Sequence, residues 1–143
     1  MRKLYQLKTR KQFVIITKGY NNKLEVLTMQ IKRYEGTGRM SRAVVHNGTI
    51  YLCGQTCSDK EGIKEQTKVV LEKIEDLLNK YGSDKKHVLS ATIYVKDMSM
   101  FQDMNEIWDS WVEDGFEPAR ACVEAKMARE SILVEISIVA AVK

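Results

Sequence analysis

A chain of 143 residues, 44% hydrophobic and 29% charged, is long enough for one core of ordinary size and too short for two. Its longest apolar runs, such as FVII and IVAAV, are far shorter than the roughly 20 residues of a membrane-spanning helix. Three cysteines form an odd set without the dense, even pattern of a secreted disulfide framework. These features predict one globular domain in a reducing, cytoplasmic setting.

The net charge of +4 is unevenly divided along the chain. Residues 1–28 contain seven Lys or Arg and one Glu, which gives +6, whereas residues 29–143 contain sixteen basic and eighteen acidic residues, which gives −2. Residues 29–143 therefore lack the basic surface that attracts nucleic acid, and neither nucleic acid nor a membrane is expected as a partner.

The basic segment 1–28 has four interpretations. A secretory signal is disfavoured, because its apolar core is only four residues long and no small-residue cleavage site follows. A transit peptide would be basic, as observed, but also rich in serine, which this segment lacks. The remaining hypotheses are a disordered basic arm and a misassigned start, with translation beginning at Met29 after codons that resemble a bacterial ribosome-binding stretch.

After Met29 the pattern predicts strands. Residues 29–34 alternate apolar and polar side chains, as a short strand does. In RAVVHNGTIYLCGQ, two β-branched runs flank Asn47-Gly48, and Asn-Gly is the strongest short-range hairpin signal because a type I′ turn needs positive φ at both central residues. We therefore predict a hairpin centred on these two residues.

Two helices follow from three- and four-residue spacing of apolar side chains. The first is predicted over residues 62–81 with a stop at Gly82, its charged side being a solvated face. Asp97 or Ser99 can cap the second, whose stripe runs through Phe101, Met104, Ile107, Trp108 and Trp111. Core packing is the expected role of these aromatic residues.

Three further strands complete the pattern, at residues 87–95, 118–126 and 133–142. In the second of these, Arg120, Cys122 and Glu124 face away from the small apolar residues. The order β-β-β-α-β-α-β-β predicts an α+β sheet with both helices on one face, and the other face needs a partner chain. If the last two strands pair as a hairpin, Cys122 lies opposite Glu135 and Arg120 lies diagonal to it.

Several segments resemble one known family. RAVVHNGTIYLCGQ, SATIYVKDMSMFQDMNEIWDSW, PARACVEA and VEISIVAA are collinear with the Rid (YjgF/YER057c) family of reactive-intermediate deaminases, and GQTCSD and LSATIYVKDM resemble its YoaB-like branch. The resemblance covers nearly all of residues 29–142. It implies a chorismate-mutase-like fold assembled as a homotrimer, with sites in three clefts between subunits.

The resemblance also implies residue roles. Arg120 would hold the carboxylate of a 2-imino acid or its enamine, and Glu135 would hold the attacking water. Cys122 would contribute mainly its backbone, while Gly54 and Asn105 match other positions that line the family's cleft. The implied reaction gives a 2-oxo acid and ammonia without metal or organic cofactor.

Other interpretations stand beside these. A diagonal Arg–Glu pair on a sheet is often a structural ion pair, Cys122 is more simply a packed thiol than a nucleophile, and Asn105 can be an ordinary helix residue. Met40 occupies the position of a tyrosine that contacts substrate in archetypal members, so the pocket lacks that hydroxyl. Two hypotheses therefore remain, a deaminase and a non-catalytic protein that binds small carboxylates or acts as a chaperone.

Overall fold

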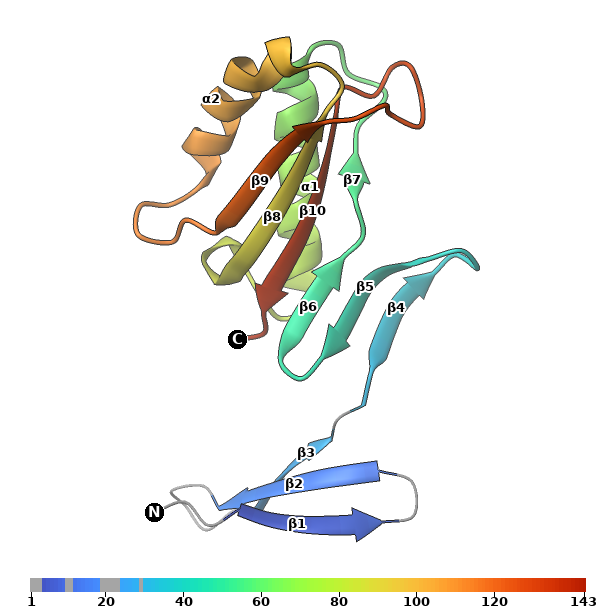
Figure 1. The fold of residues 1–143 in the computed structure, drawn as a ribbon, viewed down its shortest axis with the longest axis vertical. Coiled ribbons are helices and arrows are strands. Elements are labelled where there is room, and N and C mark those ends of the chain that lie inside the picture. The colour runs from blue at the N-terminus through green and yellow to red at the C-terminus, as the bar shows by residue number, and fades with distance from the viewer. Residues whose placement is uncertain (1–3, 10–11, 19–23, 29) are drawn as a thin grey trace.

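The computed structural model describes residues 4–9, 12–18, 24–28 and 30–143 (Figure 1). From residue 30 the chain forms, in order, β4 (Lys32–Gly36), β5 (Ser41–His46), β6 (Thr49–Leu52), β7 (Gln55–Thr56), α1 (Ile63–Lys80), β8 (Val88–Val95), α2 (Phe101–Trp111), β9 (Ala119–Glu124) and β10 (Val134–Ala141). Single 3-10 turns, Lys85–His87 and Met98–Met100, precede β8 and α2. No helix of the described part has the length and apolar character to cross a membrane.

The N-terminal segment forms a separate small sheet. Strands β1 (Leu4–Thr9), β2 (Gln12–Lys18) and β3 (Leu24–Thr28) pair antiparallel in the order β1-β2-β3. Residues 1–3, 10–11, 19–23 and 29 lie outside the described residues. The domain boundary after residue 28, and the start at Met29, stay predictions.

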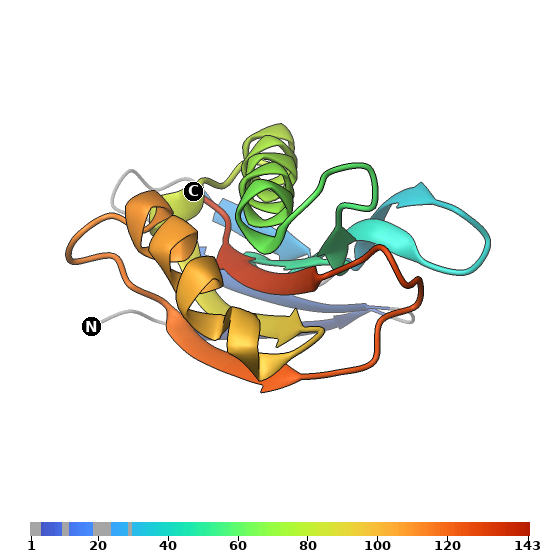
Figure 2. The ribbon, with the colours of Figure 1, turned by 90° about the horizontal axis from the view of Figure 1, so that it is seen from above.

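One mixed sheet carries the rest of the chain. Its order is β4-β5-β6-β10-β8-β9, and the two-residue strand β7 also pairs with β10. Both helices lie on the same face of this sheet (Figure 2), where the inward-facing side chains of β8 and β10 form the core with α1 and α2. The predicted α+β architecture with helices on one face is confirmed, with β7 as an additional short strand.

The predicted hairpin at Asn47-Gly48 is present. β5 and β6 pair antiparallel up to His46 opposite Thr49, and the two turn residues have φ of 50° and 72°. The predicted helices are also present. Gly82, with φ of 83°, follows the end of α1, and the Asp97 carboxylate accepts a hydrogen bond from the Ser99 backbone at 2.8 Å in the turn leading into α2.

The predicted pairing of the last two strands is wrong. β8 lies between β9 and β10, antiparallel to β10 and parallel to β9. α2 supplies the crossover that a parallel pair needs, and residues 125–133 form a loop rather than a tight turn. Alternating side chains determine which face of a strand is buried, but they do not determine which strand lies beside it.

The predicted alternation of side chains along β10 is nevertheless correct. Val134, Ile136, Ile138 and Ala140 of β10 are buried under the helices, and their neighbours in sequence face the other way. That second face, which we call the open face, includes Tyr51 and Val123, which are 48% and 45% exposed. Apolar side chains of this size on an open sheet are typical of a surface that another chain covers.

Candidate functional site

Arg120 is held at the edge of the sheet by α2. Its Nη1 donates a hydrogen bond to Asn105 Oδ1 at 2.8 Å, and its guanidinium carbon lies 5.4 Å from the centre of the Trp108 ring. Trp108 is only 5% exposed, so it provides a fixed platform, whereas Arg120 itself is exposed on an edge strand. A guanidinium oriented in this way keeps other N–H groups free for an anion.

Cys122 lies two residues further along the same strand. It pairs with Ile93 of β8 and is partly buried. Burial raises the pKa of the Cys122 thiol, and the nearby Arg120 charge opposes this effect only partly. A protonated thiol is a poor nucleophile, so the side chain fits a packing role better than a covalent one.

Glu135 lies on the open face and contacts Gly54. Glu135 pairs with Tyr94 of β8 and with Thr56 of β7. A Cβ atom added at Gly54 would be 2.0 Å from Glu135 Oε1 and 2.8 Å from its Cδ. The absence of a side chain at Gly54 therefore allows the carboxylate to lie directly against the backbone between β6 and β7.

Met40 lines a hollow beside this contact. The hollow has a volume of about 260 Å³. Its walls come from the segment that enters β5, the link between β6 and β7, β7 itself and α1: Met40, Arg42, Cys53, Gly54, Gln55, Thr56 and Lys73. Met40 is 50% exposed, so it gives the hollow a flexible apolar rim.

The structure thus brings the predicted site residues together in two groups. Arg120, Asn105 and Cys122 form the arginine group, on the helix side of the edge strand β9. Gly54, Glu135 and Met40 form the glutamate group, around β7 and the open face. The predicted proximity of Arg120 and Glu135 within one chain is wrong, because Arg120 pairs with Ala91 on the buried side of β8 whereas Glu135 pairs with Tyr94 on the open side.

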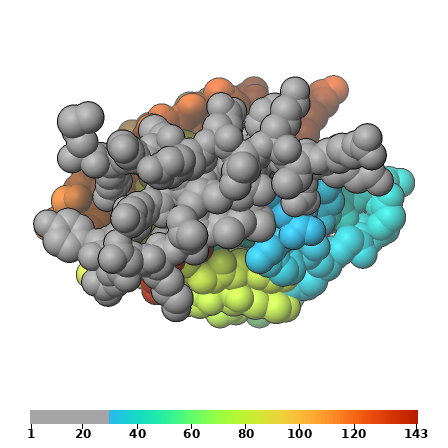
Figure 3. All heavy atoms as spheres, turned by 90° about the horizontal axis from the view of Figure 1, so that it is seen from below, coloured from blue at the N-terminus to red at the C-terminus, as the bar shows by residue number. Residues whose placement is uncertain are grey.

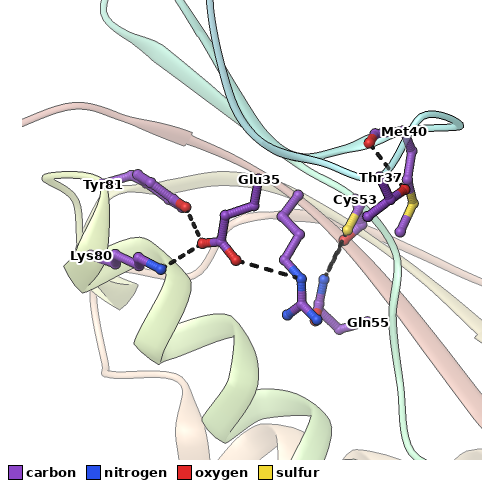
Figure 4. Close-up of polar contacts among 8 residues, drawn as sticks. Glu35, Thr37, Met40, Cys53, Gln55, Lys80 and Tyr81 are labelled. Carbon is purple, nitrogen blue, oxygen red and sulfur yellow. Dashed lines mark hydrogen bonds and ion pairs between the residues drawn. The ribbon is translucent and has the colours of Figure 1, made fainter.

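An ion-pair cluster holds β4 against the end of α1. Lys80 Nζ donates to Glu35 Oε1 at 2.6 Å, Tyr81 donates to the same oxygen, and Arg42 Nε lies 3.8 Å from Glu35 Oε2. Tyr34 stacks on Tyr81 with ring centres 4.5 Å apart. Figure 3 shows the blue and cyan surface after residue 30 beside the yellow-green surface of α1, and Figure 4 shows Glu35 reached by Lys80 and Tyr81.

This cluster predicts a pH-dependent contribution to stability. Hydrogen bonds from Lys80 and Tyr81 are the main causes that lower the pKa of Glu35 below its ordinary value of 4.5. A lowered folded-state pKa stabilises the protein above the unfolded pKa, and this stability is lost as the pH falls through the folded pKa. We expect Glu35→Gln to unfold at lower urea concentration than wild type near neutral pH, with the difference shrinking below pH 4.5.

Urea unfolding of both proteins across this pH range measures the effect. Glu61→Gln is the matched control, since Glu61 is exposed and makes no ion pair with another described residue. A wild-type advantage that persists unchanged at about pH 3 would contradict the assignment.

Sequence reasoning missed two cations that line the hollow. Arg42 follows Met40 by two residues, a spacing that places both on one side of an extended segment, so that signal was available. Lys73 occupies the face of α1 that the sequence pattern assigns to solvent, and nothing in the helical spacing distinguishes it from its charged neighbours.

Comparison with known proteins places residues 30–142 in one family. Residues 30–142 match the family described as "Endoribonuclease L-PSP". The RutC family protein YoaB of Escherichia coli is 40% identical over 114 residues, covering 80% of this chain and all of YoaB. A RutC family protein of Haemophilus ducreyi is 38% identical over 113 residues, covering 78% of this chain and 97% of that protein.

Solved structures show the same relationship. A YjgF family member from Neisseria meningitidis is 47% identical, with a TM-score of 0.79, over 80% of this chain and 97% of that one. A YjgF/YER057c/UK114 family member from Mycobacterium tuberculosis is 25% identical, with a TM-score of 0.72, over 79% of this chain and all of that one. The chain belongs to the Endoribonuclease L-PSP family, whose relatives here carry the names RutC and YjgF.

Proposed function

We propose that the protein hydrolyses 2-imino acids, or their enamine tautomers, to 2-oxo acids and ammonia at clefts between identical subunits. Family membership supports a general role of the RutC and YjgF kind. The observation that carries the finer proposal is the two-part site, with an anchored arginine at one edge and a carboxylate seated against a glycine at another place.

Arg120 suits the binding of a carboxylate. A guanidinium presents paired N–H donors that match both oxygens of the anion, which fixes the substrate in one plane. Asn105 accepts a hydrogen bond from one N–H group and the guanidinium lies over the Trp108 ring, which restricts the direction of the remaining donors before the substrate arrives.

Glu135 suits the activation of water. Its carboxylate accepts a proton as the water oxygen bonds to the imine carbon and the C=N electron pair moves to nitrogen. The proton passes from Glu135 to that nitrogen and gives a carbinolamine. Transfer of the hydroxyl proton to the amino nitrogen through the same carboxylate then lets the C–N bond break, so that ammonia leaves as the C=O bond forms. An enamine substrate first gains a proton on its terminal carbon to become the imine. The reaction needs no metal and no organic cofactor.

A second copy of the chain would unite the two groups. Arg120 lies on the edge strand β9, and Glu135 lies beside β7 on the open face, so a neighbouring subunit can bring its arginine group to this chain's glutamate group. Covering Tyr51 and Val123 would favour such an assembly. Closed cyclic symmetry repeats one contact between all subunits, and we propose a homotrimer with three equivalent clefts.

A coupled assay tests the proposal. A serine or threonine dehydratase releases enamines that hydrolyse slowly without help, and 2-oxo acid appearance is followed with and without the pure protein. We expect acceleration by the wild-type protein. No acceleration, or acceleration that survives Arg120→Ala, contradicts the proposal.

Met40 favours a second candidate, a protein that binds small carboxylates without turnover. The pocket has a thioether where archetypal relatives have a hydroxyl, so a polar contact to the substrate is absent. A thermal-shift screen of small carboxylates, with each hit abolished by Arg120→Ala and no keto-acid production, would support binding alone. The net charge of −2 after residue 28 favours a small carboxylate over RNA for either candidate.

A further inference from the structure

The hollow around Met40 contains more positive charge than the proposed reaction uses. Arg42 and Lys73 line it together with uncharged groups, and no carboxylate is among its lining residues. Arg120 already accounts for the substrate's 2-carboxylate in the proposed function. Two further cations beside the Gly54 wall therefore require a separate explanation.

The guanidinium of Arg42 is only weakly engaged by the protein. Its contact with Glu35 is at 3.8 Å and involves Nε alone, whereas Lys80 approaches Glu35 at 2.6 Å and Tyr81 also donates to that carboxylate. Glu35 is thus shared among three partners, with Arg42 the most distant. The terminal nitrogens of Arg42 make no hydrogen bond to other described residues, and its side chain is 50% exposed.

Lys73 is also only weakly engaged by the protein. Its Nζ donates one hydrogen bond, to the Thr56 carbonyl at 2.8 Å, and an ammonium has three protons to donate. The carbonyl carries no formal charge, so the positive charge of Lys73 is oriented toward the β7 backbone without being neutralised there. The pKa of Asp59 is lowered mainly by a hydrogen bond from Cys57 and least by the Lys73 charge, and Asp59 does not line the hollow.

The size of the hollow limits the ligand. About 260 Å³ corresponds to roughly nine water molecules at their volume in the liquid, which is comparable to a dicarboxylic imine of four or five carbons. Glu135 does not itself line the hollow but lies against Gly54, which does, so the reacting carbon would lie at the Gly54 end. A substrate side chain would then extend past Met40 toward Arg42 and Lys73.

We propose that Arg42 and Lys73 select substrates with a second carboxylate, so that the imines of acidic amino acids are preferred over those of neutral ones. This inference rests on the proposed function and specifies its substrate class. A second carboxylate gains charge-assisted hydrogen bonds from two cations that have spare donors. A neutral side chain in the same place gains only contact with Met40.

A comparison of two imines tests the inference. Flavin-dependent amino-acid oxidases generate the imines of aspartate and alanine in solution, and their hydrolysis is followed with the wild-type protein, Arg42→Gln and Lys73→Gln. We expect each variant to lower kcat/KM for the acidic imine by about tenfold, as for the loss of one charged hydrogen bond, while the value for the neutral imine changes by less than about threefold.

Lys68→Gln is the matched control, because it removes one positive charge from α1 at a residue that pairs with Glu65 outside the hollow. It should leave both rates unchanged. A wild-type protein without preference for the acidic imine overturns the inference, and so do variants that lower both rates equally.

Failure of the proposed function itself gives a different result. If neither imine is hydrolysed faster than in buffer, binding of succinate and propionate is measured by NMR on the same proteins. Succinate binding that is tighter than propionate binding and is lost in Arg42→Gln and Lys73→Gln keeps the dicarboxylate site without the reaction. Equal binding of both, or no binding of succinate, rejects the site as well.

Discussion

Arg120→Lys is expected to lower kcat/KM for imine hydrolysis by at least about 100-fold, although it retains the positive charge. Lysine is a point charge that cannot present paired donors to both carboxylate oxygens. It also cannot keep both the hydrogen bond to Asn105 Oδ1 and the cation–π contact with Trp108 in their present geometry. The coupled assay and a substrate titration measure the change.

Stability is expected to change little in this variant. Arg120 is exposed on an edge strand, so the cost in free energy of unfolding should be about 1 kcal/mol or less. Arg129→Lys, an exposed position in the loop between β9 and β10, is the control and should keep full activity. Retention of activity within a few-fold in Arg120→Lys would show that charge alone is sufficient and would contradict the planar binding of the carboxylate.

Gly54→Ala is expected to abolish most activity because of one methyl group. That methyl would lie 2.0 Å from Glu135 Oε1 and 2.8 Å from Cδ, so the carboxylate must leave its position. Displacing a general base from the reacting atoms typically costs about 100-fold or more in rate. Because the obstructing atoms belong to the end of a side chain, we expect a stability loss of only about 1–3 kcal/mol.

A double variant separates this mechanism from a general effect on folding. Glu135→Ala removes the obstructing carboxylate, so Gly54→Ala should be almost neutral for stability in that background. Gly36→Ala is the control glycine, since nothing lies within 4 Å of an added Cβ there. An equal stability loss with and without the Glu135 side chain would show that the contact is not the cause.

Local features of this fold could be predicted from the sequence because each depends on neighbouring residues. The Asn47-Gly48 turn requires positive φ at both positions, which these two residues tolerate. The two helices followed from apolar spacing, and the burial of β10 followed from strict alternation. Arg120 and Cys122 were correctly placed on the same face of β9 for the same reason.

Strand pairing could not be predicted in this way. We expected the last two strands to pair as an antiparallel hairpin. Which strand lies beside which, however, depends on long-range packing. β10 is buried between β6 and β8, and the crossover through α2 places β9 at the edge. Because β8 lies between β9 and β10, Arg120 is separated from Glu135. The proposed site therefore needs a second chain to complete it.

In the proposed assembly, each cleft takes its arginine from one chain and its glutamate from a neighbour. Arg120→Ala and Glu135→Gln subunits, each inactive alone, are unfolded together, refolded at equal concentrations and assayed for imine hydrolysis. With residues drawn from two chains, random mixing restores an intact pair in about a quarter of the clefts, and activity recovers to about that fraction of wild type. If both residues served the same cleft from one chain, every cleft would keep a defect and no activity would return.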